Sequence, residues 1–405
     1  MPTPDFPPKV ATLLLCDRSG KVLGTLPPFE VEVPWWQEVQ GVVAGATERF
    51  GVDVTVLRLL HAETGWGTAG GPATYLAEVD SAPDHELTPW AGADPVADHP
   101  LRLPYARPGG PAADLAWADA QLTAAGRPRT GPAEQIKTWN LSSVWRLPTA
   151  DGPVWLKVVP PFFGHEGAML RRLHTDVVPP LVAAEGGRVL LGDVPGEDHW
   201  GAELPVLERV VSMLVGLQAE WVDRVPELVE VGAPDWRAEA FVRAAERLLS
   251  VAGGDLGADE TSRLHAVVDG LPQRFARVAE CGVPDTFVHG DFHPGNTRGS
   301  AAPDGRSVLL DWGDCGIGNP LLDQAATLAS IREEQRDPLR AHWARLWRDA
   351  VPGCDPDRAA ELLGPVRALR QAMIYQVFLD GIEPDERVYH SGDPAHWLRK
   401  AAELA

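Results

Sequence analysis

The sequence of 405 residues is poor in cysteine and has no long apolar run. Its four cysteines stand at positions 16, 281, 315 and 354. They show neither paired spacing nor a metal-binding pattern, which fits a reducing compartment. No apolar run approaches the ~18 residues that a membrane-spanning helix needs, and no signal sequence opens the chain. These absences predict a soluble, cytoplasmic protein.

Positive charge is also scarce. The chain has 36 basic against 57 acidic residues, which gives a net charge of −21 at pH 7. Such a balance argues against nucleic acid and anionic membrane surfaces as partners, because both repel an acidic protein. It is compatible with a cationic small molecule. The hydrophobic content of 44% is enough for ordinary cores, and the length suggests two or three domains.

One pair of segments places two carboxylates and an amide at a defined spacing. Residues 288–296 read VHGDFHPGN, and residues 309–313 read LLDWG. Phosphoryl transfer needs a group that accepts the proton of the attacking hydroxyl, and ligands for the metal ions on the triphosphate. Asp291 and Asn296 keep the five-residue interval of these groups in protein kinases, and Asp311 follows as the second metal-binding carboxylate. An ordinary polar turn is the alternative, and the shared register disfavours it.

These segments resemble the aminoglycoside phosphotransferase family, kinase-like enzymes that phosphorylate antibiotic and sugar hydroxyls. The similarity continues through DCGIGNPLLDQA at 314–325 and covers about residues 133–405. It implies that Asp291 is the catalytic base, that Asn296 and Asp311 bind Mg²⁺, and that ATP is the phosphoryl donor, with GTP as the alternative. The hard oxygen ligands agree independently with magnesium. The expected fold is α+β and bilobal, like a protein kinase, with a small β-rich N-lobe and a mostly helical C-lobe.

A kinase-like fold also requires a lysine on a strand and a glutamate on the following helix. Residues 154–159, VWLKVV, predict a buried strand whose only charge is Lys157, in a chain with five lysines and thirty-one arginines. Glu166 opens a helical pattern nine residues later. We expect Glu166 to pair with Lys157 and aim it at phosphate. A snorkelling strand-edge lysine and a first-turn glutamate are the alternatives for each residue alone.

Residues 136–147 indicate a hairpin whose turn would lie over the phosphates. This hairpin lacks the glycines of a kinase phosphate loop, so we assign phosphate binding to Ser142 and Ser143. Trp155 occupies a position that kinases usually give to a small residue beneath the adenine. Core packing is the favoured interpretation of Trp155, and stacking on a purine is the alternative. Residues 188–197 resemble the family's hinge, and a plain strand and turn is the alternative there.

Residues 1–131 lie outside the resemblance and predict a separate small α/β domain that ends in a linker rich in proline and glycine. Its pattern of strands around a helix that ends at Gly51 is similar to the Nudix hydrolase fold. Only Glu48 remains of the glutamate cluster that binds metal in that family, so a non-catalytic cap, lid or dimerisation surface is expected. An unrelated α+β domain is an equally good interpretation. The kinase-like remainder divides into an N-lobe with hinge at 132–196 and a helical C-lobe at 197–405.

The expected function is therefore ATP- and Mg²⁺-dependent phosphorylation of a small-molecule hydroxyl, on an aminoglycoside, an aminosugar or a related metabolite. The alternatives are a kinase for another small alcohol or sugar, and a non-catalytic nucleotide-binding regulatory protein. Members of the resembled family place carboxylates around an aminosugar near the C-terminus, where this chain has an acidic cluster. A solvated acidic turn is the favoured interpretation of that cluster. Its members are Asp380, Glu383, Asp385 and Glu386.

Overall fold

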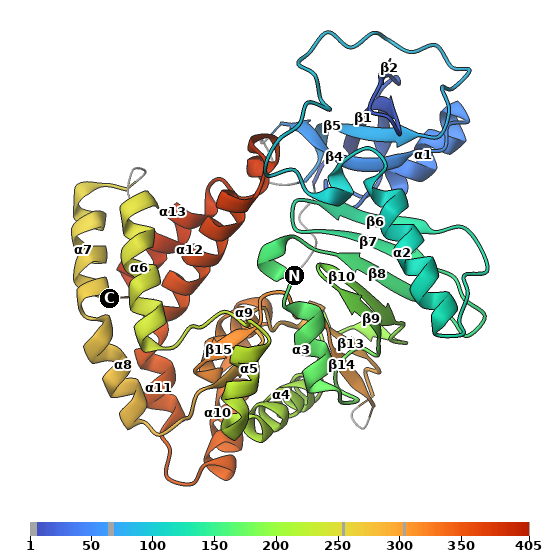
Figure 1. The fold of residues 1–405 in the computed structure, drawn as a ribbon. Helices are drawn as coiled ribbons and strands as arrows, with labels where there is room; N and C mark the ends of the chain where they lie inside the picture. The colour runs from blue at the N-terminus through green and yellow to red at the C-terminus, as the bar shows by residue number, and fades with distance from the viewer. Residues whose placement is uncertain (1–5, 64–68, 253–255, 303–304, 405) are drawn as a thin grey trace.

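The computed structural model describes residues 6–63, 69–252, 256–302 and 305–404. Three portions follow one another along the chain and adjoin in space: an α/β unit, a small lobe built on an antiparallel sheet, and a largely helical lobe (Figure 1). This arrangement confirms the α+β class and the bilobal architecture that the sequence predicts. None of the helices in these ranges is long and apolar enough to cross a membrane.

Within the described residues, the N-terminal unit is a five-stranded sheet with one helix beside it. Its strands are β1 (Lys9–Asp17), β2 (Val22–Thr25), β3 (Phe29–Val31), β4 (Thr55–Ala62) and β5 (Gly71–Val79). The order is β2-β1-β5-β4, with β3 paired to β1, and the central β1 and β5 run parallel. Helix α1 (Gln40–Phe50) ends at Gly51, whose φ of 65° is the left-handed conformation that suits glycine at a helix C-terminus.

The small lobe is an antiparallel sheet in the order β6-β7-β8-β10-β9. Its elements are β6 (Glu134–Trp139), β7 (Ser142–Leu147), β8 (Val154–Val158), α3 (Glu166–Leu173), β9 (Leu181–Glu185) and β10 (Arg188–Gly192). Side chains alternate across β8, so Leu156 is buried on one face while Trp155 and Lys157 share the other. Helix α2 (Gly110–Ala124) follows the short η2 (Pro104–Ala106) and shares the apolar core of the buried face. The opposite face is left for Lys157 and its partners.

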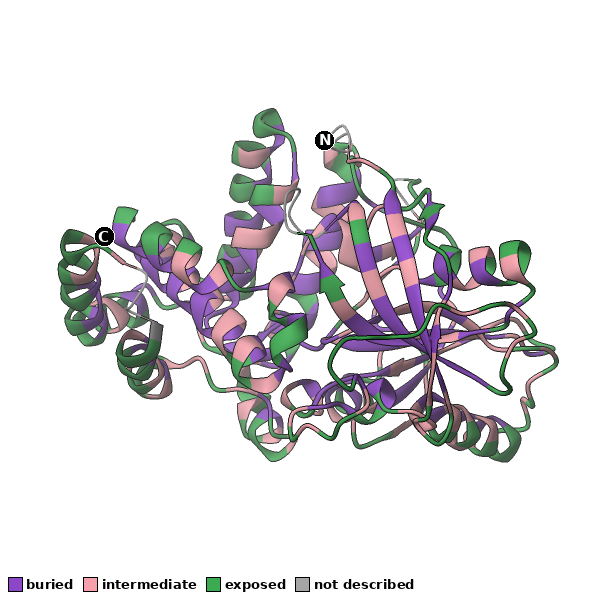
Figure 2. Ribbon diagram, turned by 90° about the horizontal axis from the view of Figure 1, so that it is seen from above, coloured by how far each residue is buried: buried purple, intermediate pink, exposed green. Residues whose placement is uncertain are grey.

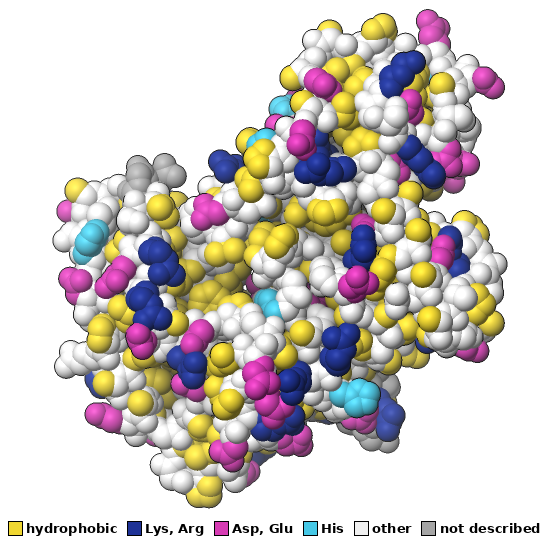
Figure 3. Space-filling model, in the orientation of Figure 1, with side chains coloured by type: hydrophobic (Ala, Val, Ile, Leu, Met, Phe, Trp, Pro, Cys, Tyr) yellow, Lys and Arg dark blue, Asp and Glu magenta, His cyan; other side chains and the backbone are white. Residues whose placement is uncertain are grey.

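The large lobe consists mainly of helices. These are α4 (Leu204–Glu220), α5 (Val225–Glu230), α6 (Ala238–Ala252), α7 (Ala258–Asp269), α8 (Leu271–Glu280), α9 (Gln324–Ser330), α10 (Glu333–Ala350), α11 (Pro356–Leu362), α12 (Gly364–Gly381) and α13 (Asp393–Glu403). Short strands lie between them: β11 (Glu197–Asp198), β12 (Thr286–Val288), β13 (Thr297–Gly299), β14 (Ser307–Leu309) and β15 (Gly316–Gly318). Helices α6, α7, α12 and α13 stand together on the side away from the small lobe (Figure 1). The surface between that group and the small lobe is hollowed and largely apolar (Figure 3).

The core of the large lobe anchors both motif segments. Phe287, Phe292 and Trp312 are fully buried, and the rings of Phe287 and Trp312 lie 5.5 Å apart. Val288 and Leu309 are buried as well. Figure 2 shows the same division throughout the fold, with buried residues on the inner faces of the helices and at alternate positions of the strands. Because close-packed interiors resist displacement, these anchors fix the polar residues between them.

The N-terminal unit contacts the small lobe through polar backbone and side-chain pairs. The Gln135 side chain on β6 accepts from the Val56 amide at 2.9 Å and donates to the Val56 carbonyl at 2.7 Å. Lys137, also on β6, forms an ion pair with Glu38 at 3.4 Å. The unit thus adjoins the outer strand of the small-lobe sheet.

The same unit contacts the large lobe through the acidic cluster near the C-terminus. Arg102 donates to both carboxylate oxygens of Glu383 at 2.9 and 2.7 Å, and Arg58 lies 3.1 Å from Asp385. Glu383 and Glu386 are buried, with 4% and 3% of their surface exposed. The expectation of a solvated acidic turn is therefore wrong for these two residues. They lie beneath the N-terminal unit. Arg58 and Arg102, which are distant in sequence, pair with Glu383, whereas burial raises the pKa of the Glu386 carboxyl to about 8.

We predict that Glu383→Gln lowers the free energy of unfolding by about 3 kcal/mol, because it leaves the buried Arg58 and Arg102 without a full counter-charge. Urea denaturation followed by circular dichroism measures this. Asp380→Asn is the matched control, since Asp380 is exposed and hydrogen-bonds only to Gln376 in the described part of the chain. Equal stability of both variants would contradict the prediction.

Candidate active site

The loop at residues 289–296 brings Asp291 and Asn296 into direct contact. The Asn296 side-chain amide donates to Oδ2 and to the backbone carbonyl of Asp291, both at 2.9 Å. His293 Nε2 lies 3.4 Å from the same Asp291 oxygen. The Asp291 side chain is 40% exposed, so its carboxylate is oriented by neighbours and still reachable from solvent. The five-residue spacing in the sequence thus becomes a contact within one tight loop.

Buried Asp323 holds the start of this loop. Its two carboxylate oxygens accept from the backbone amides of His289 at 2.9 Å and Gly290 at 2.7 Å. Gln218 donates to one of these oxygens at 2.9 Å. Gly290 has a φ of 92°, and a Cβ there would overlap the carbonyl oxygen of Asp314. Only glycine permits this close approach of two loops.

Lys157 lies between two carboxylates that come from different lobes. Its ammonium donates to Glu166 at 2.8 Å and to Asp311 at 2.7 Å. Burial disfavours the charged form of Asp311, but the Lys157 ammonium outweighs it and lowers the pKa of this carboxyl to about 2. Burial likewise disfavours the Lys157 cation, yet the two carboxylates raise its pKa above the usual value. The predicted pair of Lys157 and Glu166 forms, and Asp311 joins it.

Glu166 connects this ion pair to the second motif. It opens α3 as predicted, only 1% of its side chain is exposed, and the Trp312 amide donates to it at 3.2 Å. Burial raises the pKa of the Glu166 carboxyl, and the Lys157 ammonium opposes that shift. Asp311 itself has a φ of 59°, an uncommon backbone conformation for a residue other than glycine. The Trp312 amide thus ties the backbone next to Asp311 to α3.

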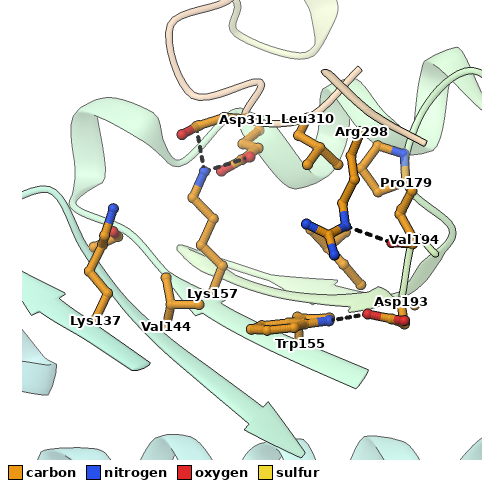
Figure 4. Close-up of a pocket in the computed structure, with 14 residues that line it drawn as sticks. Lys137, Val144, Trp155, Lys157, Pro179, Asp193, Val194, Arg298, Leu310 and Asp311 are labelled. Carbon is orange, nitrogen blue, oxygen red and sulfur yellow. Dashed lines mark hydrogen bonds and ion pairs between the residues drawn. The ribbon is translucent and has the colours of Figure 1, made fainter. Parts of the chain in front are cut away.

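A pocket of 330 Å³ adjoins the ion pair (Figure 4). Ser142, Trp155 and Lys137 line it, together with Lys157 and Asp311. The favoured interpretation of Trp155 as a core residue is wrong, because its ring is partly exposed on the pocket face of β8. Two of the five lysines of the chain line this pocket, although the sequence singled out only one. Its size suits a small organic ligand.

Ser142 and Ser143 lie on opposite faces of the hairpin. Ser142 lines the pocket, and its hydroxyl accepts from Trp139 Nε1 at 3.1 Å. The Ser143 hydroxyl is buried and accepts from Trp145 Nε1 at 3.0 Å. Strand alternation separates the two hydroxyls, so only that of Ser142 reaches the pocket.

Arg370 on α12 is a buried residue that the sequence did not single out. Its guanidinium donates to the carbonyl of Gly290 at 3.0 Å and to that of Asp314 at 2.9 Å. It therefore joins the loop that carries Asp291 to the loop that carries Asp311. No local signal marks this residue, since it lies about eighty positions from the first loop and has no motif around it.

A family model described as the phosphotransferase enzyme family matches residues 132–362, more than half of the chain. The chain belongs to the phosphotransferase enzyme family. This confirms the resemblance to aminoglycoside phosphotransferases, and the protein is a small-molecule kinase with a hydroxyl acceptor. The Nudix interpretation of the N-terminal unit stays a prediction.

Solved structures of this phosphotransferase fold are similar but distant. A candidate aminoglycoside phosphotransferase from Ralstonia eutropha is 17% identical with a TM-score of 0.51, over 72% of this chain and 97% of that one. The choline kinase LicA from Streptococcus pneumoniae is 14% identical with a TM-score of 0.51, over 71% of this chain and 99% of that one. At these identities the similarity establishes the fold alone. No curated protein sequence matches the chain.

We predict that Arg370→Met lowers the turnover of this phosphotransferase roughly 10- to 100-fold, because small shifts between the two loops spoil the alignment of the reacting groups. Nucleotide KM should change little. Steady-state kinetics with the best acceptor measures both constants, and circular dichroism verifies folding.

Arg367→Met is the matched control, because Arg367 lies one turn away on α12 and donates to the carbonyl of Leu321 instead. Equal turnover of the two variants would contradict the prediction that Arg370 aligns the two loops for catalysis. Arg370→Lys should restore part of the turnover if charge between the loops is what matters.

Proposed function

We propose that the protein transfers the γ-phosphoryl group of a purine nucleoside triphosphate to a hydroxyl of a small molecule, with Mg²⁺ as cofactor. The family resemblance implies ATP as the donor, with GTP as the alternative. The observation that carries this proposal is the Lys157 ammonium, held by Glu166 and Asp311 at one end of the 330 Å³ pocket. A compact ammonium at such a place suits phosphate oxygens.

Asn296 and Asp311 have the chemistry that a magnesium site requires. The amide nitrogen of Asn296 is engaged by Asp291, which leaves its carbonyl oxygen for a metal. Asp311 uses one oxygen for Lys157 and keeps the other. One or two hard oxygen ligands and phosphate oxygens are what Mg²⁺ usually takes in such sites. When bound there, Mg²⁺ would neutralise the charge of the triphosphate.

Asp291 is suited to the role of general base. Its carboxylate is accessible, and Asn296 and His293 limit its orientation. In the proposed reaction the acceptor hydroxyl donates its proton to Asp291 while its oxygen forms a bond to the γ-phosphorus. The bond from that phosphorus to the bridging oxygen of the nucleotide breaks, and the nucleoside diphosphate leaves.

Residues of the small lobe would bind the nucleotide or support that binding. Lys157 would contact phosphate oxygens, and Glu166 would keep its ammonium in place. Ser142 on the pocket face offers a hydroxyl, and Lys137 a second cation. The phosphate-binding role assigned to Ser143 would fall to its backbone alone, because its hydroxyl faces Trp145.

The acceptor is proposed to be a small alcohol, with aminoglycosides and aminosugars as the first candidates. The net charge of −21 is compatible with a cationic acceptor. A coupled assay of nucleoside diphosphate release across aminoglycosides, aminosugars, choline and neutral sugars tests this. Nucleotide binding without release of nucleoside diphosphate for any of these compounds would instead favour a regulatory, non-catalytic protein.

We predict that Asp291→Ala reduces turnover by about 10²- to 10⁴-fold and leaves nucleotide affinity nearly unchanged, because it removes the proton acceptor alone. Asp311→Ala should weaken the binding of the magnesium nucleotide itself. Steady-state kinetics and titration calorimetry separate the two effects.

Asp337→Asn is the control for a lost surface carboxylate, since 91% of the Asp337 side chain is exposed. Unchanged turnover of the Asp291 variant would remove the base assignment. Unchanged affinity of the Asp311 variant would remove its role as a metal ligand.

A further inference from the structure

The pocket has two chemically different ends (Figure 4). Lys157 and Asp311 mark one end, which the proposed function uses for phosphates. At the other end, β10 runs into Asp193 and Val194. A nucleotide with its phosphates on Lys157 would therefore place its base beside this second pair. The side chains at this end would therefore contact the base.

An aromatic ring covers one side of the base end. Trp155 lies two residues from Lys157 on the same face of β8, and its Nε1 donates to Asp193 Oδ1 at 2.8 Å. This bond fixes the ring in its plane. Because every base has an aromatic face, stacking on Trp155 contributes affinity without selecting a base.

A guanidinium enters the pocket from the opposite side. Arg298, on β13 just after Asn296, donates from Nε to the carbonyl of Val194 at 2.8 Å (Figure 4). Its two terminal nitrogens have neither a hydrogen bond nor an ion pair within the described ranges. Arginine presents its donors as a planar fork that matches paired acceptors. Arg298 is thus anchored with most of its donor capacity unused.

A carboxylate lies at the adjacent position of the same segment. Asp193 uses one oxygen for Trp155, and its carboxylate can accept further donors. It has no ion pair with any basic residue that the structure describes. Trp155 donates to the Asp193 carboxylate, and Arg298 donates to the carbonyl of the next residue, Val194. The carboxylate and the guanidinium are thus both attached to the 193–194 segment. The base end therefore presents an acceptor group and a donor group together.

The two purines differ in how they match this arrangement. Guanine carries acceptors at O6 and N7, which arginine binds in a bidentate manner. Its N1 and N2 donors lie on the adjoining Watson–Crick edge and suit a carboxylate. Adenine has a donor where guanine has O6, and an acceptor at N1 that a carboxylate repels. Adenine can give each charged group one contact, N7 to the arginine and the N6 amino group to the carboxylate, whereas guanine gives each of them a paired contact.

We propose that Arg298 and Asp193 select guanine, so that GTP rather than ATP is the preferred phosphoryl donor. This inference rests on the proposed function, since it concerns the nucleotide of the same site. Arg298 and Asp193 would discriminate between the bases, and Trp155 would stack on either base.

The test is titration calorimetry of GDP and ADP, each with Mg²⁺, on the full chain. Wild type should bind GDP at least about tenfold more tightly, because a bidentate arginine contact discriminates bases by ~1–3 kcal/mol. Arg298→Met keeps the stem and removes the donors, so it should weaken GDP about tenfold and change ADP by less than about threefold. Asp193→Asn should also lower the ratio of the two affinities. Melting temperatures verify that both variants fold.

Arg306→Met is the matched control, since 91% of the Arg306 side chain is exposed on the loop after β13. It should leave both affinities unchanged. Equal or tighter binding of ADP by wild type would overturn the selection of guanine, as would an equal loss of both nucleotides in the Arg298 variant. Failure of wild type to bind either nucleotide would instead refute the proposed phosphotransferase site together with this inference.

Discussion

The active-site arrangement depends on one shared cation. Lys157 and Glu166 belong to the small lobe and Asp311 to the large lobe, so the Lys157 ammonium is a polar contact that joins the lobes at the pocket. Glu166 is too deeply buried to remain ionised at no cost, and Lys157 provides the compensating charge. The amide of Trp312 then binds Glu166, which ties the backbone next to Asp311 to α3. Lys157 Nζ thus contacts carboxylates of both lobes, so a shift of one lobe relative to the other would change these contacts.

Backbone contacts maintain the rest of the site. Asp323 accepts from the amides at the start of the 289–296 loop, and Arg370 donates to carbonyls of that loop and the next. These bonds bind the main chain and leave the side chains of Asp291 and Asn296 accessible for chemistry. Preorganisation of this kind avoids the cost of ordering the loop when the ligand arrives.

The N-terminal unit is integrated with both lobes. It contacts the small lobe at Gln135 and the large lobe at Glu383, and residues from outside the small lobe contact the tip of the β6–β7 hairpin. The Trp139 ring at that tip lies 5.4 Å from Tyr389, and Tyr105 donates to the Trp139 carbonyl at 2.8 Å. A hairpin without glycines is thus supported from outside its own lobe. The unit thus contacts both lobes of the kinase-like part.

The sequence alone determined the features whose chemistry is local. The interval between Asp291 and Asn296, the strand around Lys157 and the helix that starts at Glu166 were predictable, because periodicity and motif spacing encode short-range geometry. The family follows from the same residues.

Tertiary structure decided which distant groups meet these elements. The pocket face of Trp155, the burial of Glu383, the guanidinium of Arg298 at the base end and the bridge made by Arg370 depend on contacts between residues far apart in the chain. No local pattern specifies such contacts, because burial and partner choice arise only when separate elements pack together. A lone arginine or tryptophan in a sequence therefore says little about its role until its neighbours are in place.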